Sequence, residues 1–348
     1  MARKVGNAAT IRDVAELAGV SVKTVSNYLN GYQYMREETK ARVAAAVEQL
    51  GYTVNLSARH LSLGRTGMIS LVVPTVLGGY FAELAEAVVR EAASFGLTVL
   101  LETTGGERDR ELRLLDPAKA QLVDGVMFSP VALSLADKDL LAVPFPLVLL
   151  GERVFGAPVD HVTMQNIEAM KAATEHVIKL GAQSIVALGV KDDPEPSSGM
   201  LRLKGVRRAM DAHGLSLDPK GLIPLPNYFQ STGYQVMETI LDSGIRPDAV
   251  VAFTDALALG AMAALAHRGI RVPQDVMVVG FDNIEEAEYS FPPLTTIDPG
   301  LDQIAREAVA FLEQRVVLTL GGTKRADQPE ARTLFADFEL IQRGSTAA

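Results

Sequence analysis

Short apolar runs alternate with helical segments along most of the chain, and this rhythm restricts the possible folds more than any other feature. From Met68, the runs MISLVVP, LTVLLET and DGVMFSP are separated by helical patterns, and QSIVALGV, DAVVAFT and DVMVVGFD follow helices that end at Gly181, Gly244 and Gly269. Strands that alternate with helices form parallel sheets with helices on both sides. The sequence therefore predicts an α/β body of two doubly wound parallel sheets, from about 68 to 165 and from about 166 to 297.

The composition is that of a folded protein with more than one domain. The chain has 348 residues, of which 48% are hydrophobic and 22% charged, a balance typical of globular proteins of two or three domains. Its apolar runs are too short for a membrane-spanning helix. The absence of cysteine excludes disulfides and thiolate metal sites. The first residues, MARKVGNAATIRD, lack the apolar core of a signal peptide, so we expect a cytoplasmic protein without a membrane partner.

The charge is distributed unevenly along the chain. Residues 1–66 hold nine Lys or Arg and five Asp or Glu, a net charge of +4, whereas the remainder carries −13 and the whole chain −9. A small basic segment on a large acidic body can approach phosphates while the body stays soluble. The total charge therefore does not argue against a nucleic acid partner.

The basic segment contains two short helical patterns in the stretch TIRDVAELAGVSVKTVSNYLNG. Thr10 and Asp13 form a capping-box pattern at the start of the first helix, and Gly19 suits its end. Ser21 is a suitable cap for the second helix, which ends at Gly31. A third pattern, EETKARVAAAVEQL, follows. The sequence predicts an all-α unit of three helices.

The second helix has an inward and an outward face. Val25 and Leu29 are four residues apart and are expected to face the core. In a helix-turn-helix the second helix lies in the DNA major groove, where Lys23 and Asn27 could donate to base acceptors and Val22 could contact a thymine methyl group. A helical hairpin with a solvated polar face fits the same spacing equally well. The candidate DNA-contacting residues are Thr10, Ser21, Val22, Lys23, Thr24, Ser26 and Asn27.

The stretch of 22 residues closely resembles the DNA-binding headpiece of the lactose-repressor and galactose-repressor (LacI/GalR) family. The resemblance implies that Val22, Lys23 and Asn27 read bases. The following TVNLSARHLSLGRTG is similar to the family's hinge, which implies a short helix formed on DNA, with Ala58 close to the bases and Leu61 as a minor-groove wedge. The alternative for Leu61 is a linker residue packed on the body. The expected division is a helix-turn-helix domain at 1–54 and a hinge at 55–66.

The resemblance extends over the body. The segments DGVMFSP, ALALGAMAAL, RVPQDVMVVGFDN, PPLTTI and LIQRGST look like parts of the family's effector domain. That domain shares its two-lobed fold with periplasmic sugar-binding proteins. The resemblance implies an effector and dimerisation domain at 67–348, with an N-lobe of about 67–165 and 298–330 and a C-lobe of about 166–297 and 331–345.

Ligands of open parallel sheets bind beyond the carboxyl ends of the strands, where polar and aromatic residues follow the apolar runs. Carried over by position, the resemblance implies an effector site that holds Tyr80, Phe81, Arg153, Ser198, Arg202, Tyr228, Thr254 and Asp282. Arg202 would donate and Asp282 accept, which suits a sugar. The alternatives are a structural ion pair for Arg202 and Asp282, and core packing for Tyr80 and Phe81.

The chain also departs from the family's pattern at two positions. Gln165 stands where the family commonly carries Asp, and Thr254 stands where it often carries Asn. These two departures leave the identity of the effector open.

The expected protein is a sequence-specific DNA-binding repressor that binds a palindromic operator as a homodimer and responds to a small effector, a sugar or sugar derivative. The C-terminal FELIQRGSTAA lacks the heptads of a tetramer-forming coiled coil. The five histidines show no metal-ligand spacing, and no catalytic motif is present, so no enzyme activity, metal or cofactor is expected. The alternatives are a stand-alone sugar-binding protein and a carbohydrate-active enzyme.

Overall fold

The computed structural model describes residues 9–29, 32, 34–52, 65–191 and 196–347. Contacts divide the chain into two units, Met1–Thr66 and Gly67–Ala348, which we call the headpiece and the body and describe separately. Most of the predicted hinge, with Ala58 and Leu61, lies outside the described residues. The roles of these two residues therefore stay predictions.

The headpiece contains three helices, α1 (Ile11–Ala18), α2 (Val22–Leu29) and α3 (Glu37–Leu50). The predicted capping box is present, because the Asp13 backbone N–H donates to the Thr10 hydroxyl and the Thr10 backbone N–H donates to the Asp13 carboxylate. The bond from the Thr10 backbone N–H, followed by one from the Thr10 hydroxyl to the same carboxylate, lowers the pKa of Asp13. Gly19 ends α1 in the left-handed conformation. The buried core of this unit consists of Val14, Ala15, Ala18, Val25, Val43 and Ala46.

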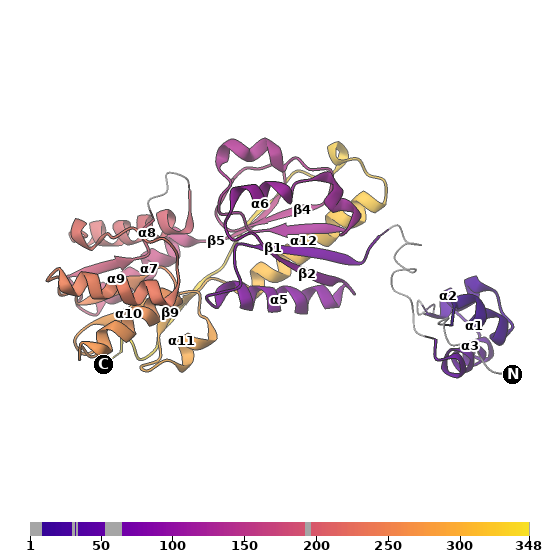
Figure 1. Ribbon diagram of the computed structural model, residues 1–348, viewed down its shortest axis with the longest axis horizontal. Coiled ribbons are helices and arrows are strands. Elements are labelled where there is room, and N and C mark those ends of the chain that lie inside the picture. Colours follow the sequence, from indigo (N-terminus) through magenta and orange to yellow (C-terminus); the bar gives the residue numbers. More distant parts are fainter. Residues whose placement is uncertain (1–8, 30–31, 33, 53–64, 192–195, 348) are drawn as a thin grey trace. The chain divides into compact units, whose positions relative to one another are not determined.

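The body is a two-lobed α/β structure with one sheet in each lobe (Figure 1). The N-lobe sheet has the order β10-β5-β4-β3-β1-β2, and all its strands are parallel. Its strands are β1 (Met68–Val73), β2 (Thr98–Thr103), β3 (Gly125–Phe128), β4 (Leu147–Leu150), β5 (Asp160–Met164) and β10 (Thr333–Ala336). The predicted doubly wound fold is thus confirmed for this lobe.

The C-lobe sheet has the order β11-β9-β8-β7-β6. Its strands are β6 (Ile185–Leu188), β7 (Ala249–Ala252), β8 (Met277–Phe281), β9 (Thr295–Asp298) and β11 (Glu339–Ile341). Only the edge strand β11 is antiparallel to its neighbour among these strands. The two-sheet prediction is therefore confirmed, with one antiparallel edge added.

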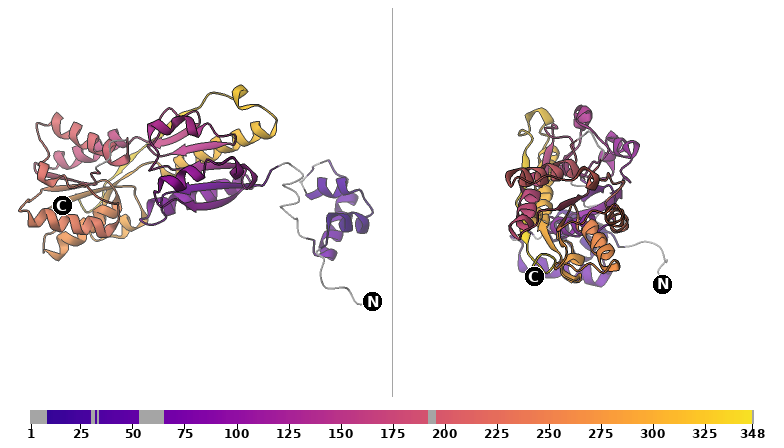
Figure 2. Two further views of the ribbon diagram at one scale, coloured as in Figure 1. Left: turned by 45° about the horizontal axis from the view of Figure 1, so that its top comes forward. Right: turned by 90° about the vertical axis from the view of Figure 1, so that its left-hand side faces the viewer.

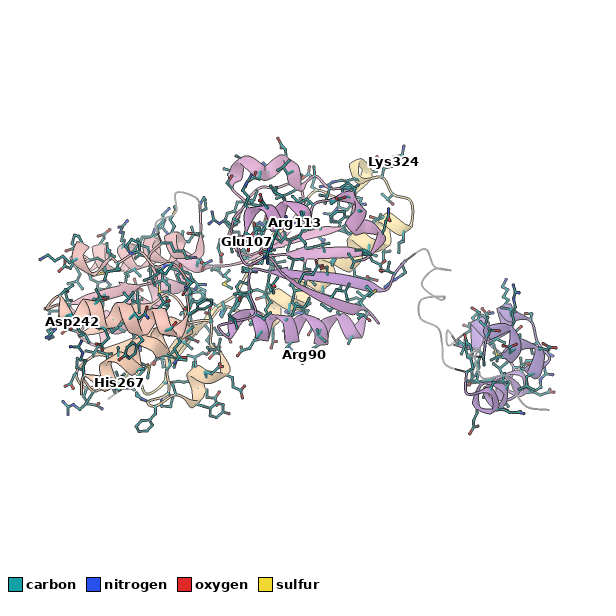
Figure 3. The ribbon with its side chains drawn as sticks, in the orientation of Figure 1. Arg90, Glu107, Arg113, Asp242, His267 and Lys324 are labelled. Carbon is teal, nitrogen blue, oxygen red and sulfur yellow. The ribbon has the colours of Figure 1, made fainter. Side chains whose placement is uncertain are left out.

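Helices cover both sheets, as the two views in Figure 2 also show. The N-lobe helices are α5 (Tyr80–Ser94), α6 (Arg108–Arg113), α12 (Leu301–Leu320) and the 3₁₀ helices η1 (Pro117–Gln121), η2 (Leu135–Leu141) and η4 (Arg325–Asp327). The C-lobe helices are α7 (Asn166–Lys179), α8 (Ser198–Ala212), η3 (Pro219–Gly221), α9 (Gln230–Asp242), α10 (Asp255–His267) and α11 (Glu285–Tyr289). Figure 3 shows Arg90 on α5, and Asp242 and His267 on the helices of the other lobe.

The chain crosses between the lobes three times, after β5, after β9 and after β10. The prediction that residues 331–345 belong to the C-lobe fits β11 but is wrong for β10. Strand β10 instead pairs with β5 in the N-lobe, where Thr333 is opposite His161 and Ala336 opposite Met164. Ala336 is buried in the core that α12 covers. The final crossing therefore follows β10 rather than preceding it.

Candidate functional site

The outward face of α2 is the candidate DNA-reading surface of the headpiece. Val22 and Lys23 are exposed, whereas Ser26 and Asn27 are half-buried. Because Val25 packs into the core with none of its surface exposed, the rotation of α2 is fixed. The structure thus places the predicted base-reading residues on the side of α2 that the core leaves uncovered.

Three of the candidate DNA-contacting residues, Thr10, Ser21 and Thr24, are expected to bind phosphate through hydroxyl groups at the helix ends. The Ser21 hydroxyl accepts from the Thr24 backbone N–H at 3.1 Å and lies 2.9 Å from the Thr24 hydroxyl. The Thr10 hydroxyl donates to the Asp13 carboxylate at 2.8 Å. These bonds fix the start of each helix, and contact of the three residues with phosphate stays a prediction.

The eight predicted effector residues line one cavity of about 680 Å³ in the body. Tyr80 and Phe81 come from the first turn of α5, Arg153 from the segment after β4, and Ser198 from the first turn of α8. The other four are Arg202, Tyr228, Thr254 and Asp282. The cavity is large enough for a small ligand, and both lobes contribute to its wall.

Arg202 is the most constrained of these residues, with 3% of its surface exposed. Its Nε donates to the Asn166 side chain at 2.7 Å, and its Nη1 donates to the Phe253 carbonyl. The guanidinium also stacks 3.6 Å from the centroid of the Phe281 ring. Its Nη1 lies 3.8 Å from Oδ1 of Asp282, so the ion pair given as the alternative for these two residues is present, and their contact with an effector stays a prediction.

Asp282 follows β8 in an unusual backbone conformation, with φ of 123°, and the next residue, Asn283, has φ of 54°. Non-glycine residues adopt such conformations only where surrounding contacts enforce them. Here the Asp282 N–H donates to the Ile297 carbonyl, and the Asn283 side chain donates to Asp298. Desolvation raises the pKa of Asp282, while the Arg202 charge opposes this shift. The site therefore contains a buried carboxyl group that faces the cavity.

The N-lobe wall of the cavity depends on a buried carboxylate. Glu111 of α6 has none of its surface exposed and accepts from the backbone N–H groups of Val131, Ala132 and Leu133 at 2.8–3.1 Å. Burial raises its pKa, while these bonds and the charge of Arg153 lower it. Val131 lines the cavity. Glu111 thereby fixes one segment of the wall without lining it.

Aromatic rings form much of the remaining wall. The rings of Tyr80 and Phe81 meet edge to face with centroids 5.1 Å apart. The Tyr228 hydroxyl donates to the Gly189 carbonyl at 2.9 Å. A Cβ atom at Gly199 would lie 2.4 Å from the Tyr228 hydroxyl oxygen, so glycine at this position leaves the space that the phenol occupies.

Thr254 and Gln165 differ in their relation to the cavity. Thr254 lines it and caps α10, since its hydroxyl accepts from the Leu257 N–H at 3.2 Å. Gln165 is absent from the lining, and its amide donates to the Ala336 carbonyl at 3.1 Å, which links two of the lobe crossings. Gln165 thus contacts a lobe crossing rather than the cavity.

Sequence reasoning missed several polar residues of this region, among them Ser129, Glu152 and Asn166. Ser129, directly after β3, lines the cavity and is 6% exposed, and the rule of strand carboxyl ends could have found it. Glu152 also lines the cavity, and its carboxylate accepts from the Asn166 side chain at 2.8 Å. Because Asn166 also accepts from Arg202, it links a carboxylate of the N-lobe to the guanidinium of the C-lobe.

The cavity combines buried charges, hydroxyl groups and aromatic faces, an arrangement suited to binding a polar ring. Among the described residues, no group of three or more His, Asp or Glu is placed to hold a metal ion. In the same part of the chain, no helix is both long and apolar enough to cross a membrane.

Comparison with known proteins identifies the two units. Residues 10–55 match the model of bacterial regulatory proteins of the lacI family, and residues 174–346 match a periplasmic binding protein-like domain. The ribose operon repressor of Escherichia coli strain K12 is 31% identical over 310 residues, which cover 88% of this chain and 93% of the relative.

Two solved structures are similar as well. A LacI-type transcription regulator from Bifidobacterium animalis is 32% identical with a TM-score of 0.72, over 81% of this chain and 100% of that one. The lac repressor dimer bound to operator and the anti-inducer ONPF is 25% identical with a TM-score of 0.79, over 98% and 100%. The matches span both units, and we conclude that the chain belongs to the lacI family of bacterial regulatory proteins.

Proposed function

We propose that the protein is a sequence-specific transcriptional repressor that binds operator DNA as a homodimer and responds to a small molecule held in the body. The observation that carries this proposal is the presence in one chain of a basic helix-turn-helix unit and a cavity lined by all eight expected effector residues. The lac repressor dimer, which was solved with operator and an anti-inducer, supports it. We also propose that the protein works in the cytoplasm, where a regulator that binds operator DNA acts, and that its activity is binding rather than catalysis.

In the headpiece, Val22, Lys23 and Asn27 read base edges in the major groove, and Thr10, Ser21, Thr24 and Ser26 contact the DNA backbone. In the hinge, Ala58 and Leu61 enter the minor groove. A dimer places two headpieces on two half-sites, so the operator is nearly palindromic.

In the body, Arg202 and Asp282 hold polar groups of the effector, and the aromatic rings pack against its faces. A carbohydrate is the proposed class, because the cavity pairs charged hydrogen-bonding groups with aromatic walls and a similar protein is named a ribose operon repressor. Effector binding changes the angle between the lobes and thereby the stability of the hinge on DNA.

The test begins with duplexes that the full-length protein enriches from a random DNA pool. Gel shifts at several salt concentrations should show tight binding to the enriched sequence and a steep loss of affinity with salt. Binding that ignores sequence would contradict the proposal, and turnover of a carbohydrate would favour the enzyme alternative. Thermal shifts against a carbohydrate and nucleoside library then identify the effector, because a ligand stabilises the state that binds it.

A further inference from the structure

The first turn of α5, in the N-lobe, contacts the C-lobe beside the cavity. The backbone N–H of Glu285, the first residue of α11, donates to Oε1 of Glu83 at 2.8 Å. A Cβ atom at Gly79 would lie 2.9 Å from Cδ1 of Ile284, so the two segments are already in close contact. Two independent contacts therefore join the lobes directly after Asp282 and Asn283.

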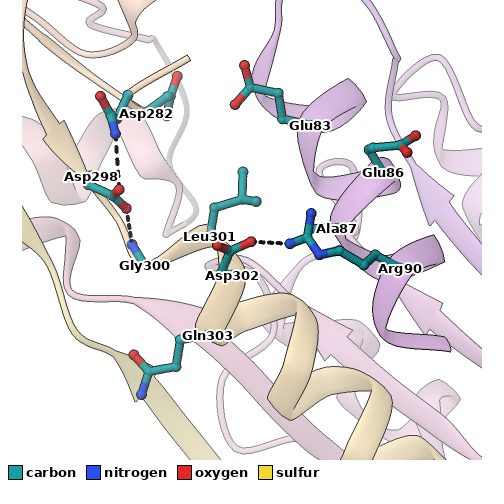
Figure 4. Close-up of a pocket in the computed structure, with 11 residues that line it drawn as sticks. Glu83, Glu86, Ala87, Arg90, Asp282, Asp298, Gly300, Leu301, Asp302 and Gln303 are labelled. Carbon is teal, nitrogen blue, oxygen red and sulfur yellow. Dashed lines mark hydrogen bonds and ion pairs between the residues drawn. The ribbon is translucent and has the colours of Figure 1, made fainter. Parts of the chain in front are cut away.

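The Glu83 carboxylate faces other acids from several elements. Glu83 and Glu86 of α5 line a second cavity of about 420 Å³ together with Asp282, Asp298 and Asp302 (Figure 4). Glu285 and Glu286 of α11 also act on Glu83 electrostatically. The basic residue of this lining, Arg90, is paired with Asp302. The acids here outnumber the one arginine, whose charge Asp302 already balances.

Contact between the lobes favours the acceptor oxygen of Glu83 and disfavours its negative charge. Its oxygen accepts the one hydrogen bond that joins α5 and α11 in the part of the chain that the structure describes, and acceptance does not require a charge. Its negative charge, in contrast, is partly desolvated and lies near like charges. Burial, followed by the charges of Glu286, Glu285 and Asp298, raises the pKa of Glu83, although the bond from Glu285 opposes this.

We propose that Glu83 is a proton-sensitive latch between the lobes. In the closed arrangement, in which α5 contacts α11, the carboxylate oxygen of Glu83 holds α11 while its negative charge weakens the contact. A proton on the second oxygen leaves the bond to the Glu285 N–H intact and removes the repulsion. Closed lobes therefore bind this proton more tightly than separated lobes. By linkage, the contact between the lobes is strongest at low pH, and it weakens as the pH rises through the pKa that Glu83 has in the closed arrangement.

Lobe distances can be measured in the full-length protein by electron–electron double resonance. Because the chain has no cysteine, spin labels can be attached only at introduced cysteines, at the exposed residues Asp139 on η2 and Asp211 on α8. For the otherwise unchanged chain, we expect the closed population to grow as the pH is lowered, because the raised pKa of Glu83 lets the closed lobes take up the proton at a higher pH than the separated lobes.

Three further variants separate the hydrogen bond from the charge. Glu83→Gln keeps an acceptor oxygen without the charge, so its lobes should stay closed across the pH range. Glu83→Ala removes the acceptor, and the ratio of closed to open molecules at low pH should fall about two- to tenfold, as expected for one lost hydrogen bond. Glu86→Gln removes a charge from the same helix without touching α11 and is the matched control, which should keep the pH response.

A pH response that persists in Glu83→Gln, or a closed population in Glu83→Ala equal to that of the parent, would overturn the latch. A consequence for DNA rests on the proposed function and is measured separately, by gel shifts of the same variants on the enriched operator. If the lobe distances follow the pattern while operator affinity stays constant, the latch stands and the coupling of the lobes to DNA fails.

Discussion

Nη1 of Arg202 lies 3.8 Å from Oδ1 of Asp282, and both side chains are at most 5% exposed. The two residues are unequal partners. Arg202 also bonds to Asn166 and to the Phe253 carbonyl, whereas the ion pair is the contact that the structure gives the Asp282 carboxylate among the described residues. Arg202 therefore supports the fold of the C-lobe, while Asp282 is oriented toward the cavity.

This asymmetry predicts different costs for removing each partner. Arg202→Met should destabilise the body by about 3–5 kcal/mol, because it leaves a buried carboxylate without its counter-charge. Asp282→Asn should cost less than Arg202→Met, since Arg202 keeps its bonds to Asn166 and to the Phe253 carbonyl. Chemical denaturation of both variants measures the difference, and equal costs would show that the pair acts as a symmetric structural unit.

The contribution of Asp255 to the stability of the body should decrease as pH rises from about 4 to about 7. Asp255 is fully buried, and desolvation raises its pKa to about 7, although the bonds from Thr296 and Ile284 oppose the shift. Desolvation raises the pKa of Asp282 as well. A folded-state pKa above the unfolded value gives stability that is present at low pH and lost as pH rises, by up to about 1.4 kcal/mol per pH unit for each group.

The variant Asp255→Asn tests this assignment. Its amide oxygen can accept from Thr296, but its NH₂ group faces the Ile284 N–H, so the variant should be less stable at low pH. Its stability should nevertheless vary less with pH than that of the parent. Thermal unfolding at several pH values measures both effects, and an unchanged slope would mean that Asp255 does not titrate in this range.

The packing of α9 against α10 should be sensitive to a single methyl group. A Cβ atom at Gly260 would lie 2.0 Å from the Gln230 carbonyl oxygen and 2.7 Å from the Tyr234 nitrogen, so backbone would have to move. We expect Gly260→Ala to destabilise the body by about 3 kcal/mol. Gly221→Ala is the control, because its nearest neighbour would be the Val186 side chain at 3.6 Å. A similar effect of both substitutions on the unfolding midpoint would refute the packing argument.

Much of the fold could be predicted because the signals are local. The capping box at Thr10 and the glycine at Gly19 set the ends of α1, and the apolar runs set the strands. The effector residues meet in one cavity because the carboxyl ends of parallel strands share an edge. These inferences need only short stretches of sequence and one rule of topology.

What could not be predicted depends on long-range contacts. The stretch TLFADFELI contains β10 and β11, which join different sheets although only two residues separate them. No local pattern decides this, because the choice depends on the register with β5 and β9. The sequence alone also does not predict in which direction a side chain points. Gln165 is an example, because it bonds to a lobe crossing instead of lining the cavity.

The most direct test of the account measures sequence discrimination by α2. The ratio of affinities for the enriched operator and a scrambled duplex should be compared between the parent, Lys23→Ala and Asn27→Ala, with circular dichroism as the check of folding. Because neither residue is part of the buried headpiece core, the fold should persist. The account predicts that Asn27→Ala lowers the ratio about 10- to 100-fold, the value of one specific base contact. An unchanged ratio in both variants would contradict it.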